Sequence, residues 1–184
     1  MRPISFAATL RFVHDFKQAY DAVERRIENR YGIPVSISDV VHPNTGDFDG
    51  MRIMVDYDQD LESALFVLVH LFGHTVQWNL SAEYREIGTD LSIGKGEAEL
   101  QKIYDYEKNA TRYSMQLMHD AGVKDLDSWV SDWWGADWRY LEHFYKTGEK
   151  LDFRKLLQPG KDLLLTPLTI PEFQPQKWLS RWSF

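Results

Sequence analysis

The sequence predicts an α+β fold that is mainly helical and contains a small antiparallel sheet. Apolar residues recur at steps of three and four over several segments of helical length, two short segments alternate apolar and polar residues, and turn-forming residues separate those two segments. We find no internal repeat. The length of 184 residues suits one domain, 1–184, in which residues 123–184 form a Trp-rich and Pro-containing extension packed on the rest.

The N-terminal part predicts one amphipathic helix followed by a hairpin. Between about Leu10 and Tyr31 the apolar side chains share one face, and Gly32 is placed to end the helix. The segment IPVSISDVV then alternates apolar and polar residues, PNTGDFDG is rich in turn formers, and MRIMVDY alternates again. We therefore expect an antiparallel hairpin over about 34–57.

Two long helices are expected in the middle of the chain. The segment from Asp60 to about Leu80 is apolar around most of its circumference, which is typical of a buried helix. Residues 81–96 are polar and contain three glycines, which predicts a loop. A second helix is expected from about Glu97 to Asp120, because Gly122 stands in the position that usually ends a helix.

The C-terminal region is rich in tryptophan. Residues 125–148 have a helical pattern that is interrupted at Gly135, so we expect two short helices there. The Trp cluster at 129–138 is explained by core packing, and a partner surface is the alternative. The tail from Leu157 contains four prolines and should be extended and packed on the protein.

The composition limits the classes of function. A net charge of −7 opposes binding to the phosphate backbone, so we expect no direct nucleic-acid partner. The absence of Cys excludes disulfides, thiolate metal sites and Cys nucleophiles. The first residues lack an apolar core of signal-peptide length, and no run of about 18 apolar residues occurs. We therefore expect a soluble, cytoplasmic protein with no membrane partner.

His70 and His74 predict a metal site. They lie four residues apart, so on a helix both rings project from one face and can bind one ion. The helix is nearly all apolar, and an unsatisfied buried polar group costs about 1–3 kcal/mol, so the two rings imply a shared polar partner. Gly73, which costs about 1 kcal/mol relative to Ala within a helix, indicates close approach of another backbone. The alternative is a pair of core histidines hydrogen-bonded to their neighbours.

Glu107 is the candidate third ligand. Zinc usually has a third protein ligand, and a catalytic site keeps a fourth position for water. Glu107 lies in the middle of the second long helix, and Ala110 and Thr111 share its face. A small residue there lets two helices approach, and a hydroxyl can orient the ligand. The alternative is an ordinary surface glutamate.

These segments resemble the ImmA/IrrE family of gluzincin (zincin-like) metallopeptidases. The family motif is HELGH on one helix and ExEANxFAxxLL on a second, and this chain has HLFGH at 70–74 and EKNATRYSMQLM at 107–118. The resemblance covers roughly residues 10–118. It implies a zincin-like fold, with the hairpin packed on the two helices, and zinc held by His70, His74 and Glu107. By family analogy it also implies a peptide or protein partner, such as a helix-turn-helix transcriptional regulator.

The chain departs from the family at the residue that performs catalysis. Leu71 occupies the position of the catalytic glutamate, and a leucine can neither accept nor donate a proton. Asn109 and Thr111 replace the family's second glutamate and its asparagine. Loss of a general base typically lowers a rate by about 10² to 10⁴-fold, so peptide hydrolysis should be very slow. The missing glutamate is not a ligand, so metal binding is still expected.

Other polar residues are candidates for positions behind the ligands or in the cleft: Gln77, Thr111, Tyr113 and His119. Packing in the core or a position at a helix end is the alternative for each of them. Glu62 lies eight residues from His70, about 12 Å along the helix axis, and cannot replace the missing base directly. Glu83 and Glu86 in the expected loop would have to swing inward to do so.

Three functions fit these observations. The first is a zinc-holding, metallopeptidase-like protein that binds a peptide or protein and hydrolyses little or nothing. The second is an active zinc-dependent peptidase with a base from elsewhere, because zinc alone lowers the pKa of bound water toward about 7. The third is a metal-free interaction domain on the same fold. The sequence favours the first.

Overall fold

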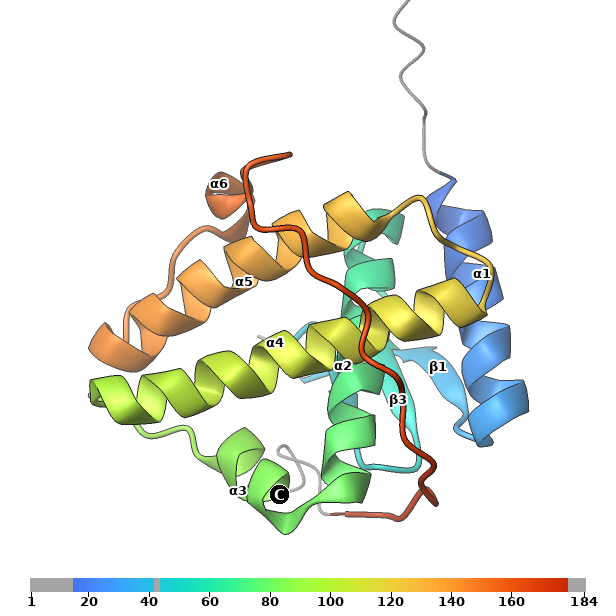
Figure 1. The fold of residues 1–184 in the computed structure, drawn as a ribbon, viewed down its shortest axis with the longest axis horizontal. Coiled ribbons are helices and arrows are strands. Elements are labelled where there is room, and N and C mark those ends of the chain that lie inside the picture. The colour runs from blue at the N-terminus through green and yellow to red at the C-terminus, as the bar shows by residue number, and fades with distance from the viewer. Residues whose placement is uncertain (1–14, 42–43, 179–184) are drawn as a thin grey trace, which may run out of the picture.

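Two long helices cross at the centre of the molecule (Figure 1). They are α2 (Leu61–Leu80) and α4 (Glu97–Asp120), and both have the bounds that the sequence predicts. The computed structural model describes residues 15–41 and 44–178. It confirms an α+β fold that is mostly helical with a small sheet.

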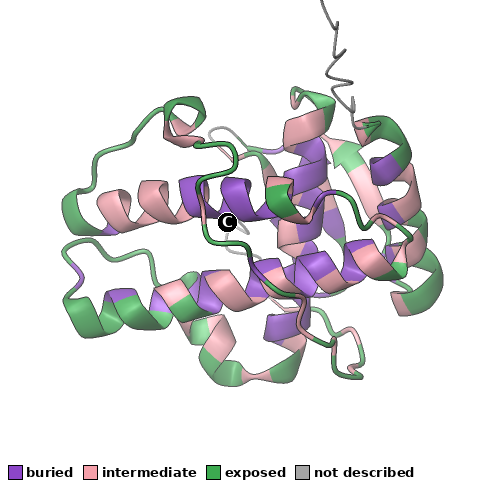
Figure 2. Ribbon diagram, turned by 45° about the horizontal axis from the view of Figure 1, so that its top comes forward, coloured by how far each residue is buried: buried purple, intermediate pink, exposed green. Residues whose placement is uncertain are grey.

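Helix α2 is the core of the fold, as its apolar composition predicts. Asp60 caps its N-terminus by accepting a hydrogen bond from the Ser63 backbone N–H. Leu68, Val69 and Phe72 are fully buried, and Figure 2 shows buried residues over much of the helix. Helix α4 ends at Asp120, with Ala121 as its C-cap and Gly122 next at φ 88°. Of the residues described, none belongs to a helix with the length and apolar character needed to cross a membrane.

The N-terminal helix α1 (Phe16–Arg26) continues into a π-helical turn, η1 (Ile27–Tyr31). Gly32 follows in the left-handed conformation with φ 66° and ends the helix where the sequence predicts. The expected start near Leu10 lies outside the described residues. The buried face of α1 packs against α2 in the main core.

The sheet is mixed, so the prediction of an antiparallel hairpin over 34–57 is wrong. Its strands are β1 (Val35–Ser38), β2 (Gly46–Phe48) and β3 (Ile53–Asp56), in the order β1-β3-β2. The segment expected to be a turn contributes β2, which pairs antiparallel with β3. That additional reversal makes β3 run parallel to β1. Strand β2 therefore lies at an edge of the sheet, beside α2.

The expected loop at 81–96 contains a helix in its first half, α3 (Ala82–Thr89). Ser81 caps it by accepting a hydrogen bond from the Glu83 backbone N–H at 3.1 Å. The polar composition of this segment suits a surface helix as well as a loop, which explains the incorrect prediction.

The Trp-rich segment forms one continuous helix, α5 (Asp127–Thr147), and not the two short helices predicted. Gly135 breaks no helix. Its missing side chain leaves room for the Asp162 carboxylate, which would lie 2.3–2.6 Å from a Cβ at this position. Arg139 donates two hydrogen bonds to the same carboxylate, at 2.6 and 2.8 Å. The glycine therefore makes room for a contact between α5 and the tail.

The chain ends in a short helix, α6 (Phe153–Leu156), and the extended tail that the prolines predict. The tail runs across α4 in Figure 1. The Leu168 N–H donates to the Arg112 carbonyl at 3.0 Å, and the Trp178 N–H donates to the Asp49 carbonyl at 2.6 Å. The tail thereby joins α4 to the β2–β3 turn.

Candidate metal centre

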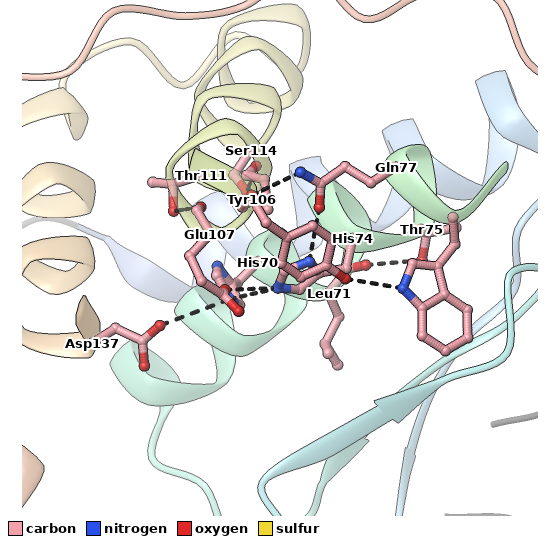
Figure 3. A network of polar contacts seen from close by, with 12 residues as sticks. His70, Leu71, His74, Thr75, Gln77, Tyr106, Glu107, Thr111, Ser114 and Asp137 are labelled. Atoms are coloured by element: carbon pink, nitrogen blue, oxygen red, sulfur yellow. Dashed lines mark hydrogen bonds and ion pairs between the residues drawn. The ribbon is translucent and has the colours of Figure 1, made fainter. Parts of the chain in front are cut away.

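Two histidines on α2 and one glutamate on α4 place three ligand atoms together (Figure 3). His74 Nε2 lies 2.9 Å from His70 Nε2, and Glu107 Oε2 lies 3.1 Å from His70 Nε2 and 3.0 Å from His74 Nε2. The structure therefore brings together the three residues that the sequence predicts as ligands, and this group could hold a metal ion.

The triangle of ligand atoms has the size that a small divalent ion needs. Two atoms that each lie 2.0–2.2 Å from a tetrahedral zinc ion are separated by about 3.3 Å. The three observed separations are within about 0.4 Å of that value and are nearly equal. A small outward movement of the side chains would therefore admit an ion.

A hydrogen-bond chain fixes the tautomer of His74. The Gln77 Nε2 amide donates to the Tyr106 carbonyl at 2.7 Å, so its Oε1 faces His74 Nδ1 at 2.9 Å. Because an amide oxygen only accepts, Nδ1 must carry the proton, and in the neutral ring Nε2 then has a free lone pair. Gln77, predicted as a candidate behind the ligands, thus prepares His74 to bind a metal.

Aromatic rings surround the two imidazoles. Tyr106 stacks on His74 with ring centroids 4.6 Å apart, and Phe66 stacks on His70 at 5.4 Å. Within the described ranges, His70 Nδ1 is buried and has no hydrogen-bond partner. On its Nδ1 side, His70 is therefore held by packing alone, whereas His74 Nδ1 is held by the hydrogen bond to Gln77.

The ligands meet because α2 and α4 pack unusually closely. A Cβ at Gly73 would lie 2.1 Å from the Ala110 carbonyl oxygen, which confirms the close approach predicted from this glycine. Ser114 strengthens the contact by donating from Oγ to the Val69 carbonyl at 2.7 Å. Thr111 Oγ1 donates to the Glu107 carbonyl at 3.1 Å, so it bonds the helix backbone and not the ligand carboxylate.

The ligand atoms lie at the wall of a cleft of about 550 Å³. Strand β2 lies along one side, and the aromatic rings of Phe66, Trp133 and Phe153 are among the lining residues. Leu71 also lines the cleft, and its Cδ1 would lie 2.7 Å from a Cβ at Gly46 of β2. Position 71, where the resemblance would place a catalytic glutamate, is thus occupied by an apolar side chain packed against the sheet.

Two predicted candidates lie elsewhere. Tyr113 is buried in the main core and does not line the cleft. His119 Nε2 is paired with Asp127 Oδ1 at 2.7 Å, where it connects α4 to the start of α5. Both are candidates for the cleft by sequence, but Tyr113 faces the core and His119 faces Asp127.

The acidic residues considered as replacement bases do not line the cleft either. Glu62 accepts a hydrogen bond from the Trp129 indole at 2.9 Å and is paired with Arg154. Glu83 and Glu86 belong to α3, and neither lines the cleft. None of the three is placed to act as a general base.

Asp137 on α5 is the residue that sequence reasoning missed. It lines the cleft, and its Oδ2 lies 3.8 Å from His70 Nε2. The one signal in the sequence was an acidic residue within a strongly aromatic helix, WWGADWRY. Spacing could not show that this helix folds back onto the candidate metal ligands.

The two carboxylates have opposite pKa shifts. Burial raises the pKa of Glu107, but the nearby His74 ring and hydrogen bonds with both histidines outweigh burial and lower this pKa below its ordinary value. Burial raises the pKa of Asp137 to about 7, since the neighbouring His70 only partly opposes it and Glu107 adds to it. Glu107 is therefore ionised and ready to bind a cation, whereas Asp137 lacks a full counter-charge.

The comparisons with known proteins give no family or relative. No protein-family model matches the chain, and no curated protein or solved structure matches it significantly.

Proposed function

We propose that this chain is a zinc-binding, metallopeptidase-like protein that binds a peptide or protein segment and has little or no peptidase activity. The convergence of His70 Nε2, His74 Nε2 and Glu107 Oε2 within 3.1 Å of one another carries the proposal. Nitrogen and carboxylate ligands of this kind suit zinc, and the chain has no Cys to favour a thiolate site.

Leu71 supports a binding function over hydrolysis. Zinc-dependent peptide hydrolysis needs a group that takes a proton from water and passes it to the leaving amine. Leucine has no such group, and Glu62, Glu83 and Glu86 do not line the cleft. Under this proposal, the bound metal stabilises the structure or takes part in recognition of the partner.

The cleft supports a peptide as the bound molecule. Strand β2 lies at the sheet edge, and an edge strand can pair with an extended peptide through backbone hydrogen bonds. The aromatic lining offers apolar contacts to the side chains of such a peptide. Following the resemblance, we propose a segment of a transcriptional regulator as the first partner to test.

Metal analysis of the purified full chain tests the proposal. We expect one zinc per chain after reconstitution, loss of zinc in H74A and E107Q, and no turnover of casein. His143 lies on α5 and does not line the cleft, so H143A should keep its zinc. Zinc binding should also raise the melting temperature, and a chelator should lower it.

The alternatives give different results. A wild-type chain that takes up no zinc, and whose melting temperature is unchanged by a chelator, would support a metal-free domain. Turnover that depends on zinc and disappears in H74A would show an active peptidase.

A further inference from the structure

Asp137 approaches the metal-binding residues from a third helix. Figure 3 shows its side chain, which comes from α5, pointing toward His70 and Glu107. Its side chain is 19% exposed, and its Oδ2 lies 3.8 Å from His70 Nε2. The cleft therefore has a second acidic side chain beside the three predicted ligands.

The fold holds Asp137 in this position. Two residues later, Arg139 is bound to Asp162 and to the Leu156 carbonyl, so its guanidinium is not directed to Asp137. Asp132, earlier on α5, accepts a hydrogen bond from the Gly160 backbone at 2.7 Å. These contacts anchor α5 on the following segment and fix the face that it turns to the cleft.

Asp137 has no strong cationic partner. Within residues 15–41 and 44–178, His70 is the one basic side chain that pairs with its carboxylate, and only at 3.8 Å. A largely buried carboxylate is costly unless a cation or several hydrogen bonds compensate it. The side chain therefore lies where a divalent ion would supply the missing charge.

The charges also balance with four ligands. Two neutral imidazoles, the carboxylates of Glu107 and Asp137 and one divalent cation sum to zero net charge, whereas three ligands leave a net charge of +1. In surroundings lined by aromatic side chains, a neutral assembly costs less to bury than a charged one.

We infer that Asp137 is a fourth protein ligand, so that α2, α4 and α5 all hold one zinc ion. This inference rests on the proposed function. Its 3.8 Å separation from His70 Nε2 is about 0.5 Å longer than the roughly 3.3 Å between ligand atoms of a tetrahedral zinc ion. Asp137 also lies outside the group of His70, His74 and Glu107, whose ligand atoms are all within 4.8 Å of one another, so its carboxylate must move toward Glu107 and His74 when the ion binds.

Four protein ligands are typical of a structural zinc site, whereas a catalytic site keeps one position for water or substrate. A closed site explains how the chain retains metal-binding residues without the catalytic glutamate. The ion then fastens the Trp-rich helix to the two central helices, and the cleft beside it serves recognition.

Cobalt substitution of the full chain tests the inference, because the visible spectrum of Co²⁺ reports the number and exchange of its ligands. We expect the wild-type spectrum to be unchanged by acetohydroxamate, and the D137N spectrum to change because a position has opened. D137N should also bind zinc at least about tenfold more weakly in competition with a chromophoric chelator. The control is E142Q on the same helix, since Glu142 is paired with Lys146 at the surface.

Each outcome separates the two proposals. Equal zinc affinity of D137N and wild type, or a wild-type Co²⁺ spectrum that responds to acetohydroxamate, would overturn the fourth ligand and leave the three-residue zinc site standing. The effect of acetohydroxamate on the wild-type Co²⁺ spectrum is measured without any variant. A folding defect in D137N therefore does not weaken the test. Failure of the wild type to bind one zinc or cobalt per chain would overturn the proposed function itself.

Discussion

Gly73 of α2 contacts the backbone of Ala110 in α4, so that a Cβ at position 73 would lie 2.1 Å from the Ala110 carbonyl oxygen. His74 follows the glycine directly, and Glu107 lies three residues before the alanine. This close contact between the two helices therefore lies beside the candidate ligands. Any separation of the helices moves Glu107 away from both histidines.

We expect G73A to destabilise the protein although Ala is the better helix former. The clash is with backbone atoms and can be relieved only by moving the helices apart. Overpacking typically costs about 1–3 kcal/mol and sometimes more, while the gain in helix propensity is about 1 kcal/mol. We expect a net loss of about 2 kcal/mol in urea unfolding and weaker zinc binding. At Gly96 a Cβ meets only ordinary contacts, so G96A should cost about 1 kcal/mol or less.

Replacement of Gln77 by Leu should weaken metal binding without removing a ligand. The Gln77 Oε1 holds the proton on His74 Nδ1, and leucine of similar volume cannot accept that hydrogen bond. Loss of such a partner typically lowers metal affinity by about 10 to 100-fold. Chelator competition measures the affinity, and far-UV circular dichroism verifies folding. Q101L on the exposed surface of α4 is the control, and an unchanged affinity in Q77L would contradict the proposed role.

The metal-free protein should lose stability between about pH 4 and pH 7 because of Asp137. Folding raises the pKa of this residue from its ordinary 3.8 to about 7, mainly through burial. Between these values the folded chain holds a proton that the unfolded chain has released. The unfolding free energy therefore falls as pH rises, by at most about 1.4 kcal/mol per pH unit, and the effect is complete above pH 7.

The measurement is urea unfolding in chelator at several pH values. D137N lacks the titrating group, so its stability should depend less on pH over this range, whereas E142Q should follow the wild type. Parallel curves for D137N and wild type would show that Asp137 titrates normally in the folded protein.

The sequence predicts the central part of the fold and site well because the signals there are local. The bounds of α2 and α4 follow from apolar periodicity and from Asp60 and Gly122 at their ends. The spacing of His70 and His74 and the cost of Gly73 likewise need no knowledge of distant residues. Glu107 is harder to predict as a ligand, because its position on the second helix points to metal binding mainly through the family resemblance.

The errors come from contacts between residues far apart in the sequence. Strand β2 exists because three residues of a turn-rich segment pair with β3, and so short a strand has little pattern of its own. Gly135 lies inside a helix because Asp162 from the tail packs against it. Asp137 lies near His70 only because α5 packs back against the cleft. Local periodicity contains none of this information.

A glutamate at position 71, as in the family that the sequence resembles, should not by itself give hydrolysis. If Asp137 closes the site, L71E supplies a base but the ion has no position for water. We therefore expect L71E and D137N to be as inactive as the wild type, and the double variant L71E/D137N to gain at least about 10²-fold in zinc-dependent casein hydrolysis. L71Q/D137N is the matched control, because glutamine has the same shape and cannot act as a base. Activity in L71E alone would show that the fourth position is already open, and Asp137 would then be excluded as a ligand.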